Sequence, residues 1–299
     1  METTPWIWRN GAFVPWEQAQ THLLTSTLHY GAGVFEGVRC YLTNQGAAVF
    51  RLRDHMERLL YSAGVLKMEV RFTLDELCTA VLETLKENGM KAGYIRPLIY
   101  FSEQDMGFDP KRDKVDVVIA CWPWAEYFPA EGVRVKLSSY RRIHPQSTVI
   151  DAKISGHYVN SILAIQELRG TDYDESLLLD HEGYVAEGAV ENIFCVKDRV
   201  LLTPQKGSIL PGITRNTILR LAHDLGYETR EMKLLPEDLF SAQEAFFTGT
   251  LAEVVPIASV DAHVFPLAPG PVTQHLRRTY GELVAGRLSQ YHSYLSFCH

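Results

Sequence analysis

Four short β-strand patterns follow one another between residues 176 and 203, and they limit the possible folds more than any other feature of the chain. Their sequences are SLLLD, YVAEG, ENIFCV and RVLLT, and Gly-containing or charged turns separate them. Apolar runs of this length bounded by turn residues are typical of β-strands. A further strand is expected over 133–138, and helices are expected over 158–169 and 214–225. The second half of the chain is therefore predicted to be a mixed α/β domain that is dominated by strands.

The first half of the chain combines helices with strands that are expected to pair largely antiparallel. The segment WIWRNGAFV (6–14) predicts a hairpin, because both residues of its Asn10-Gly11 turn tolerate positive φ. Thr73 and Glu76 form a capping-box pattern at the start of a helix. The elements expected after the hairpin are helices over 54–66 and 73–88 and strands over 94–101 and 115–122.

Proline and glycine punctuate the segment PWAEYFPAEG, residues 123–132, which separates the two halves. We interpret this segment as a linker between domains. The predicted organisation is a small N-terminal α/β domain over 1–122, the linker over 123–132, and a larger, strand-rich α/β domain over 133–299. A chain of 299 residues is long enough for two such domains.

Composition and motif searches disfavour several classes of protein. The net charge of -7 and the lack of basic runs argue against nucleic acid as a partner. No apolar stretch approaches the ~20 residues of a membrane helix, and the N-terminus lacks the pattern of a signal peptide. The five cysteines are widely spaced and form no CxxC pair, so we expect reduced thiols in a cytoplasmic protein and no metal site. The sequence motifs of zinc proteases, P-loop NTPases, serine hydrolases and Rossmann dehydrogenases are missing as well.

Lys153, in the segment DAKISGHYVNS, is the lysine whose sequence context suggests chemistry. It stands between a strand-like run and an apolar helix pattern, beside small residues. A lysine that forms a Schiff base needs such a place, because its amine must be desolvated enough to lose its proton and its neighbours must let a ring approach. An exposed loop lysine is the other interpretation, and the local sequence leaves both open.

Seven sequence blocks together resemble the branched-chain aminotransferase family, whose members are pyridoxal-phosphate enzymes with a two-domain, mixed α/β (α+β), D-amino-acid-aminotransferase-like fold. Each block is modest alone, but seven in the same order from residue 28 to residue 257 are specific. The blocks are LHYGAGVFEGVRCY (28–41), RLRDHMERLLYSA (51–63), YIRPLIY (94–100), AKISGHYVNSILA (152–164), VAEGAVENIF (185–194), LPGITR (210–215) and FTGTLAEVVPI (247–257).

The resemblance implies three residues around the ring of pyridoxal 5'-phosphate. Lys153 would hold the cofactor covalently and then move a proton between Cα of the substrate and C4′ of the cofactor. Glu187 would pair with the pyridine nitrogen and keep it protonated, which makes the ring an electron sink. Tyr158 would bind the ring O3′. Taken one at a time, Glu187 could also be a surface carboxylate at a strand end, and Tyr158 a core aromatic at a helix start.

The resemblance also implies donors for the cofactor phosphate. The segment LPGITRNT places Gly212 and then Ile213 and Thr214 at a helix start, where free backbone N–H groups and the helix dipole suit a dianion. Arg58 would add a charge-assisted hydrogen bond and Thr250 a hydroxyl. An ordinary capped helix and a solvated helix arginine are the alternative interpretations.

Substrate recognition carries the branched-chain part of the prediction. Tyr94 and Arg96 stand two residues apart in a strand and so face the same side, where they can take carboxylates. In the family the tyrosine serves the α-carboxylate, the arginine serves the distal carboxylate of glutamate, and aromatic residues form the wall for an aliphatic side chain. The substrate-binding residues that the resemblance implies are Tyr30, Phe35, Arg39, Tyr94, Arg96, Trp124, Tyr127, Thr250 and Leu251.

The expected activity is a two-step transfer of amino groups between branched-chain L-amino acids and 2-oxoglutarate, by a homodimer or a dimer-based homohexamer. Two positions depart from the family pattern: His157 stands where several members have Asn, and Val190 replaces a common Gly. Val190 could narrow the space near the cofactor, so the substrate range stays open. Transaminases of D-amino acids or (R)-amines and aminodeoxychorismate lyases share the fold and are the nearest alternatives, and a non-catalytic cofactor-binding homologue is a more remote one.

Overall fold

The computed structural model describes residues 2–103, 106–124, 128 and 131–298. Its contacts divide the chain into two compact units, of which unit 1 comprises Met1–Ala125, Ala152–His157 and Glu282–His299, and unit 2 comprises Glu126–Asp151 and Tyr158–Gly281. The units are interleaved along the chain, whereas the predicted domains are continuous. Lys153, which falls within the predicted C-terminal domain, thus packs as part of unit 1. The domain boundaries at 122 and 133 stay a prediction, and residues 125–127 and 129–130 of the expected linker lie outside the described residues.

Unit 1 is built on an eight-stranded sheet with the order β17-β5-β4-β6-β7-β1-β2, in which β3 also pairs with β6. All of its pairings are antiparallel, as the sequence predicted for the first half of the chain. The strands are β1 (Trp6–Arg9), β2 (Ala12–Pro15), β3 (Gly33–Phe35), β4 (Val38–Thr43), β5 (Gly46–Phe50), β6 (Gly93–Phe101), β7 (Val115–Trp122) and β17 (Leu295–Phe297). The helices are α1 (Ser26–Tyr30), α2 (Leu52–Val65) and α3 (Leu74–Glu87), with short 3₁₀ turns at Trp16–Gln18, Ser155–His157 and Ser289–Tyr294.

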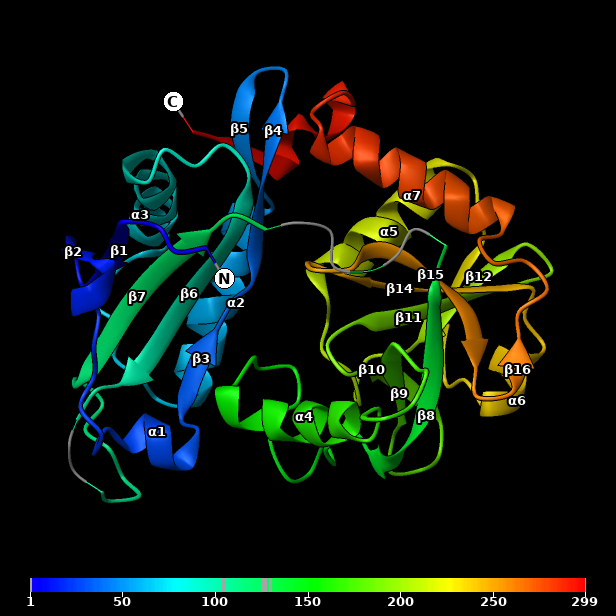
Figure 1. Ribbon diagram of the computed structural model, residues 1–299, viewed down its shortest axis with the longest axis horizontal. Coiled ribbons are helices and arrows are strands. Elements are labelled where there is room, and N and C mark those ends of the chain that lie inside the picture. Colours follow the sequence, from blue (N-terminus) through cyan, green and yellow to red (C-terminus); the bar gives the residue numbers. More distant parts are fainter. Residues whose placement is uncertain (1, 104–105, 125–127, 129–130, 299) are drawn as a thin grey trace. The chain divides into compact units, whose positions relative to one another are not determined.

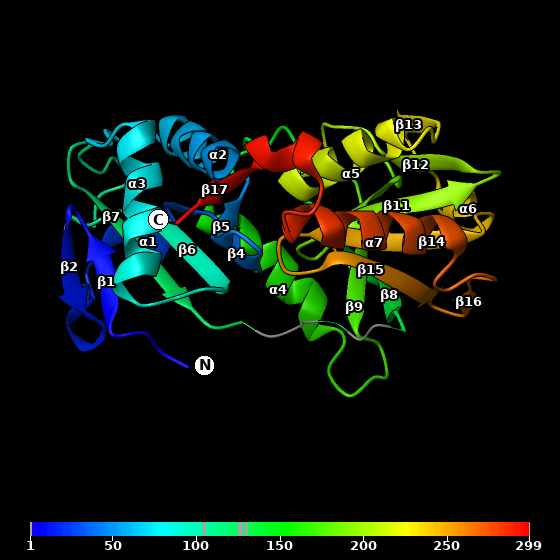
Figure 2. The same cartoon turned by 90° about the horizontal axis from the view of Figure 1, so that it is seen from above.

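Helices α2 and α3 pack against one face of this sheet (Figures 1 and 2). Buried leucines on both helices, among them Leu59 and Leu77, join strand residues such as Ile95 and Ile119 in one apolar core. The predicted capping box is present, because the Thr73 hydroxyl accepts from the Glu76 N–H and the Glu76 carboxylate accepts from the Thr73 N–H. The predicted hairpin is confirmed too, with β1 and β2 joined through Asn10 and Gly11, both at positive φ. Strands β3, β4 and β5 had no predicted counterpart.

Unit 2 contains a nine-stranded sheet that closes on itself. Six strands form a ring in the order β8-β9-β10-β11-β14-β15, which the pairing of β15 with β8 completes. Strands β12, β13 and β16 extend it. The strands are β8 (Val133–Arg141), β9 (Glu175–Leu179), β10 (Val185–Gly188), β11 (Asn192–Lys197), β12 (Val200–Pro204), β13 (Thr229–Met232), β14 (Glu244–Gly249), β15 (Glu253–Val260) and β16 (His263–Val264). The helices are α4 (Tyr158–Gln166), α5 (Ile213–Asp224), α6 (Pro236–Phe240) and α7 (Pro271–Val284), the last of which ends within the residues of unit 1.

The ring is a small barrel filled by a buried apolar cluster. Val135, Leu177, Ile193, Phe247 and Ile257 contribute to it from five of the six strands. Helix α4 contacts β8 and β9 on the outside, and α5 contacts β14 and β13 (Figure 1). The closed ring leaves no unpaired edge among these six strands, so polar groups at its rim are held by rigid backbone on both sides. Within the described ranges, no helix has the length and apolarity to cross a membrane.

Glu175 is a buried acid that carries a stability prediction. It starts β9 and, two residues before Leu177, faces the same side of the strand. Its side chain accepts a hydrogen bond from the Ser176 N–H, and burial raises the pKa of Glu175 to about 7. The folded protein therefore keeps this proton to a higher pH than the unfolded chain does, and ionisation destabilises the fold progressively as the pH rises from about 4.5 to about 7.

We expect Glu175→Gln to stabilise the protein at pH 8 by up to about 3 kcal/mol relative to its effect at pH 4.5, since an amide in this place never ionises. Urea unfolding of the wild type and the variant at both pH values measures this difference. An equal effect at the two pH values would show that Glu175 does not titrate in this range.

Candidate active site

The backbone of Lys153 is fixed on the sheet of unit 1. The Lys153 N–H donates to the Ser62 hydroxyl at 2.9 Å, and its carbonyl accepts from the Phe35 N–H at 3.2 Å. The next residue, Ile154, forms a bridge to Val34 of β3. The Lys153 Nζ lies 5.0 Å from the centroid of the Phe35 ring. An amine on a fixed backbone, with an aromatic face on one side, is partly shielded from water while its reach is restricted to a small volume.

A row of polar and aromatic side chains crosses the sheet of unit 1. Arg39 of β4, Tyr94 of β6 and Trp122 of β7 are direct partners in the strand register. Arg96 lies two residues beyond Tyr94 on the same face, where its Nη2 donates to the Tyr94 hydroxyl at 3.1 Å and its guanidinium lies 4.7 Å from the centroid of the Phe35 ring. The structure thus brings together four residues that the sequence proposed for substrate binding, and Trp122 joins them.

Two buried nitrogens on this face have no hydrogen-bond partner among the described residues. They are Nε of Arg96 and Nε1 of Trp122. The centroid of the Tyr94 ring lies 5.1 Å from that of Trp122 and 5.5 Å from that of Trp124. Buried donors without acceptors are costly unless a ligand supplies the acceptor. A carboxylate would supply acceptors for the guanidinium and indole N–H donors on this face.

Tyr30 and Tyr127 also belong to the proposed substrate-binding set, but the structure does not place them on this face. The Tyr30 hydroxyl donates to the Met106 carbonyl at 3.1 Å, and the Tyr30 ring lies 4.8 Å from the Phe108 ring. Tyr30 therefore points toward the 106–108 segment in this structure. Tyr127 lies outside the described residues.

Glu187 occupies the point where the barrel of unit 2 closes. It is the residue of β10 that pairs with Asn192 of β11, and it is 5% exposed. Its Oε1 accepts from Arg142 Nε at 2.5 Å, and its Oε2 accepts from Asn192 Nδ2 at 3.1 Å and from the Leu210 N–H at 3.0 Å. One cationic and two neutral donors therefore satisfy both oxygens of this buried carboxylate.

The start of helix α5 lies beside Glu187 in the same unit. Asn192 Nδ2 donates to the Leu210 carbonyl as well as to Glu187, so one amide ties the acid to the loop that enters the helix. Gly212 is the N-cap, and no side chain caps the helix. A Cβ at Gly212 would lie 2.0 Å from Asn192 Oδ1, which makes glycine a steric requirement here. The first N–H groups of α5, at buried Ile213 and Thr214, are therefore arranged as an anion site requires.

Strand β11 lies between Glu187 and the strand that leads to Thr250 and Leu251. Asn192 pairs with Glu187 on one side and with Thr248 of β14 on the other. Thr250 and Leu251 occupy the turn that follows β14 and leads to β15. Tyr158 is the first residue of α4, and two residues further Asn160 accepts from Arg142, the partner of Glu187.

Arg142, Asn192 and Trp122 are residues that the sequence analysis missed. Asn192 follows Glu191 in the block VAEGAVENIF, and its position five residues after Glu187 across a tight turn was a usable signal. Arg142 stands 45 residues from Glu187 and had no local signal, since only the parallel pairing of β8 with β9 brings it near.

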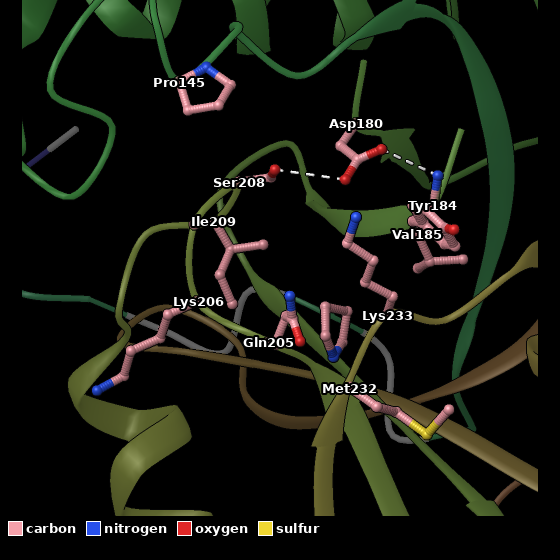
Figure 3. Close-up of a pocket in the computed structure, with 12 residues that line it drawn as sticks. Pro145, Asp180, Tyr184, Val185, Gln205, Lys206, Ser208, Ile209, Met232 and Lys233 are labelled. Carbon is pink, nitrogen blue, oxygen red and sulfur yellow. Dashed lines mark hydrogen bonds between the residues drawn. The ribbon is translucent and has the colours of Figure 1, made fainter. Parts of the chain in front are cut away.

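Unit 2 also has a pocket of about 270 Å³ whose lining includes none of the residues proposed to bind the cofactor or the substrate (Figure 3). Asp180 accepts there from the Ser208 hydroxyl at 3.3 Å and from the Tyr184 N–H at 2.9 Å, as the dashed lines show. The bond from Ser208 ties Asp180 to the loop that also contains Leu210, whose N–H donates to Glu187.

Comparison with known proteins identifies relatives over almost the whole chain. Residues 33–260, more than half of the chain, match the class IV amino-transferase family. The branched-chain-amino-acid aminotransferase of Pseudomonas aeruginosa is 45% identical over 286 residues, which cover 94% of this chain and 93% of that protein. The crystal structure of a branched-chain aminotransferase from Thermoproteus uzoniensis with norvaline has a TM-score of 0.96 at 43% identity, over 99% of this chain and 100% of that one. The structure of the Thermobaculum terrenum branched-chain amino acid aminotransferase in its PLP-form has a TM-score of 0.92 at 35% identity, over 99% of both chains.

The chain therefore belongs to the class IV aminotransferases. Within this family it stands with the branched-chain-amino-acid aminotransferases, which are enzymes that use pyridoxal phosphate. The family, the fold class and the cofactor that the seven sequence blocks implied are thus confirmed. The roles of the individual site residues stay predictions.

Proposed function

We propose that Lys153 is the catalytic residue of this aminotransferase, and that the residues described above bind its cofactor. The features present fit pyridoxal phosphate: a lysine on a fixed backbone, a buried carboxylate that accepts from three donors, and a helix N-terminus without a side-chain cap. When bound, pyridoxal phosphate supplies an electron sink for the electrons that the substrate Cα–H bond releases.

The protein's own groups carry out the remaining tasks. Lys153 Nζ would hold the cofactor, and as a free amine it would take the proton from the substrate Cα and return it on the cofactor. Glu187 would pair with the pyridine nitrogen, and its hydrogen bonds from Arg142 and Asn192 hold the carboxylate in place for that contact. Tyr158 donates to the ring oxygen. Together, the N–H groups of Ile213 and Thr214, the Thr250 hydroxyl and the Arg58 guanidinium bind the phosphate.

The surface of Arg96, Tyr94 and Phe35 carries the proposal for the substrates. One cation in contact with aromatic faces can take a carboxylate in one half-reaction and present apolar rings to a branched alkyl group in the other. We therefore assign L-leucine, L-isoleucine and L-valine, with 2-oxoglutarate and glutamate as the partner pair. Arg39, Trp124, Tyr30, Tyr127 and Leu251 complete the proposed substrate set.

The absorption spectrum of the purified protein tests this assignment. Pyridoxal phosphate bound to Lys153 absorbs in the visible range, and L-isoleucine should remove that band while D-alanine and an (R)-amine leave it unchanged. Loss of the band with D-alanine or the amine alone would replace the substrate assignment with one of the alternative transaminases. A protein that stays colourless after addition of pyridoxal phosphate would contradict the proposal as a whole.

Gly37 offers a test of the substrate surface. A Cβ at this position would lie 2.0 Å from the Tyr94 hydroxyl oxygen and 2.9 Å from Tyr94 Cζ, so Gly37→Ala must displace the ring and break the bond from Arg96. We expect the KM for amino acid and oxo acid to rise about tenfold, which corresponds to the loss of one hydrogen bond to a charged group. Gly64→Ala is the matched control, because its Cβ would meet no atom within 4 Å. Steady-state kinetics that show equal KM values for both variants would exclude Tyr94 from substrate binding.

We further propose a homo-oligomer, as a dimer or a dimer-based hexamer, in the cytoplasm. All five cysteines are free in the structure, which suits a reducing compartment. Sedimentation velocity of the holoenzyme distinguishes monomer, dimer and hexamer.

A further inference from the structure

Glu36 is an acidic residue buried in a place that is costly for a charge. It follows Phe35 at the end of β3, and its side chain is 0% exposed. The Glu36 N–H donates to the Pro97 carbonyl at 2.9 Å, so the backbone is fixed on β6. A carboxylate without water is tolerated only when donors saturate its oxygens. Its partners therefore determine what Glu36 can do.

Both main partners come from one face of helix α2. Arg58 donates from Nε to Oε1 at 2.5 Å and from Nη2 to Oε2 at 2.9 Å, which is a two-pronged contact between guanidinium and carboxylate. His55, one helical turn earlier, shares Oε2 through its Nδ1 at 2.7 Å. The Gly37 N–H adds a longer contact of 3.3 Å. The two carboxylate oxygens thus meet two arms of one guanidinium, one imidazole and one amide, all within unit 1.

The charges of this cluster are consistent with a fixed ion pair. Burial by itself would raise the pKa of Glu36, but Arg58 and His55 hold that pKa below its ordinary value, so the carboxylate is ionised. Burial lowers the pKa of His55, against the opposing effect of Glu36. At neutral pH the cluster is therefore a Glu36–Arg58 ion pair with a neutral imidazole as a third member.

We propose that Glu36 is a positioning residue that sets the orientation in which Arg58 meets the cofactor phosphate. This inference rests on the proposed role of Arg58. An unrestrained arginine side chain has many rotamers, and ordering it on a ligand costs binding free energy. The two-pronged contact with Glu36 fixes the plane of the guanidinium before any ligand arrives, because two parallel hydrogen bonds define both its place and its rotation. The two prongs are Nε and Nη2, so Nη1 belongs to the opposite edge of the guanidinium.

A positioning role and a purely structural role differ in their dependence on the phosphate. Pyridoxal has the same ring and aldehyde as pyridoxal phosphate but no phosphate group. If Glu36 acts through Arg58, its replacement weakens the binding of pyridoxal phosphate and leaves the binding of pyridoxal unchanged. If Glu36 only stabilises the fold around the site, its replacement weakens the binding of both ligands alike.

The experiment measures dissociation constants of the full-length apoenzyme for pyridoxal phosphate and for pyridoxal by absorbance titration. Glu36→Asp keeps the charge but shortens the side chain, so the two-pronged contact is lost; Glu36→Gln keeps the length but loses the charge. We expect the dissociation constant for pyridoxal phosphate to rise about tenfold in both variants and that for pyridoxal to change less than about twofold. Glu36→Asp keeps the test decisive if the uncharged variant does not fold.

Asp54→Asn is the matched control on the same helix. Asp54 also receives a two-pronged contact, from Arg51 Nε at 2.6 Å and Nη2 at 2.5 Å, but this pair is not among the proposed cofactor residues. Its removal should leave the ratio of the two dissociation constants unchanged. An equal change of the ratio in Asp54→Asn and the Glu36 variants would overturn the inference.

Arg58→Ala separates this inference from the proposed function. Arg58→Ala should weaken the binding of pyridoxal phosphate and not that of pyridoxal. Glu36→Gln added to Arg58→Ala should then have no further effect on the ratio of the two dissociation constants, because Glu36 acts through Arg58. No selective loss in Arg58→Ala would refute the proposed phosphate role of Arg58 itself. Selective loss in Arg58→Ala without any in the Glu36 variants, or equal weakening of both ligands in those variants, would refute the positioning role alone.

Discussion

Replacement of Lys153 by alanine should lower kcat by on the order of 10⁴-fold or more, because the change removes both the covalent hold on the cofactor and the base that moves the proton. The fold should survive. The hydrogen bonds to Ser62 and from Phe35 are made by the backbone of residue 153 and remain in the variant. Turnover of L-isoleucine with 2-oxoglutarate measures the loss, and circular dichroism measures the retained fold.

Two further measurements make the Lys153 prediction specific. Lys206→Ala removes an exposed lysine from the loop before α5 and should leave kcat unchanged. Methylamine added to Lys153→Ala should restore part of the activity, since a small free amine can take over the proton transfer. Substantial activity of Lys153→Ala without added amine would show that another group is the base.

Glu187→Gln should have the second largest effect, a loss of about 10²–10³-fold in kcat with much of the cofactor still bound. The glutamine has the same shape, but it is neutral and cannot hold a proton on the pyridine nitrogen. Its amide also presents N–H groups to Arg142, Asn192 or the Leu210 N–H, all of which are donors. The variant therefore loses the electron sink and strains the three contacts that fix the acid.

A pre-steady-state measurement of the half-reaction with L-isoleucine checks this prediction, since it isolates the step in which the Cα–H bond breaks. Glu182→Gln is the control, because Glu182 is exposed and its salt bridge within the described residues is with exposed Lys233. Wild-type rates in Glu187→Gln would mean that the pyridine nitrogen does not depend on this carboxylate.

Local patterns in the sequence predicted many elements because the forces involved are local. The capping box of Thr73 and Glu76 joins residues three apart, and both of its hydrogen bonds are present. The strand predicted over 115–122 coincides with β7, whose alternate residues are buried. Strands β3, β4 and β5 were not predicted, because 33–50 contains glycines and mixed residues whose strand conformation depends on pairing with β6 and β17.

The same distinction between local and distant contacts applies to the candidate site. Lys153, Glu187, Arg58 and the helix start at Gly212 were proposed from blocks of adjacent residues. The groups that hold them were not: Arg142 reaches Glu187 from 45 positions away, and Glu36 reaches Arg58 from 22. The sequence blocks carried the family resemblance, while the pairs between distant blocks had no adjacent signal.

The sequence by itself determined the family, the cofactor class and the main helices, and it supplied the proposed site residues, because ordered short motifs and helix or hairpin signals depend on neighbours along the chain. Only the tertiary structure decided that residues 152–157 and 295–297 return to the sheet of unit 1 and that six strands of unit 2 close into a ring. It alone also placed Arg142, Asn192 and Glu36 against the proposed cofactor residues. The physical reason is that strand pairing and the burial of charge join groups far apart in the chain, and the free energy of those contacts depends on the whole fold.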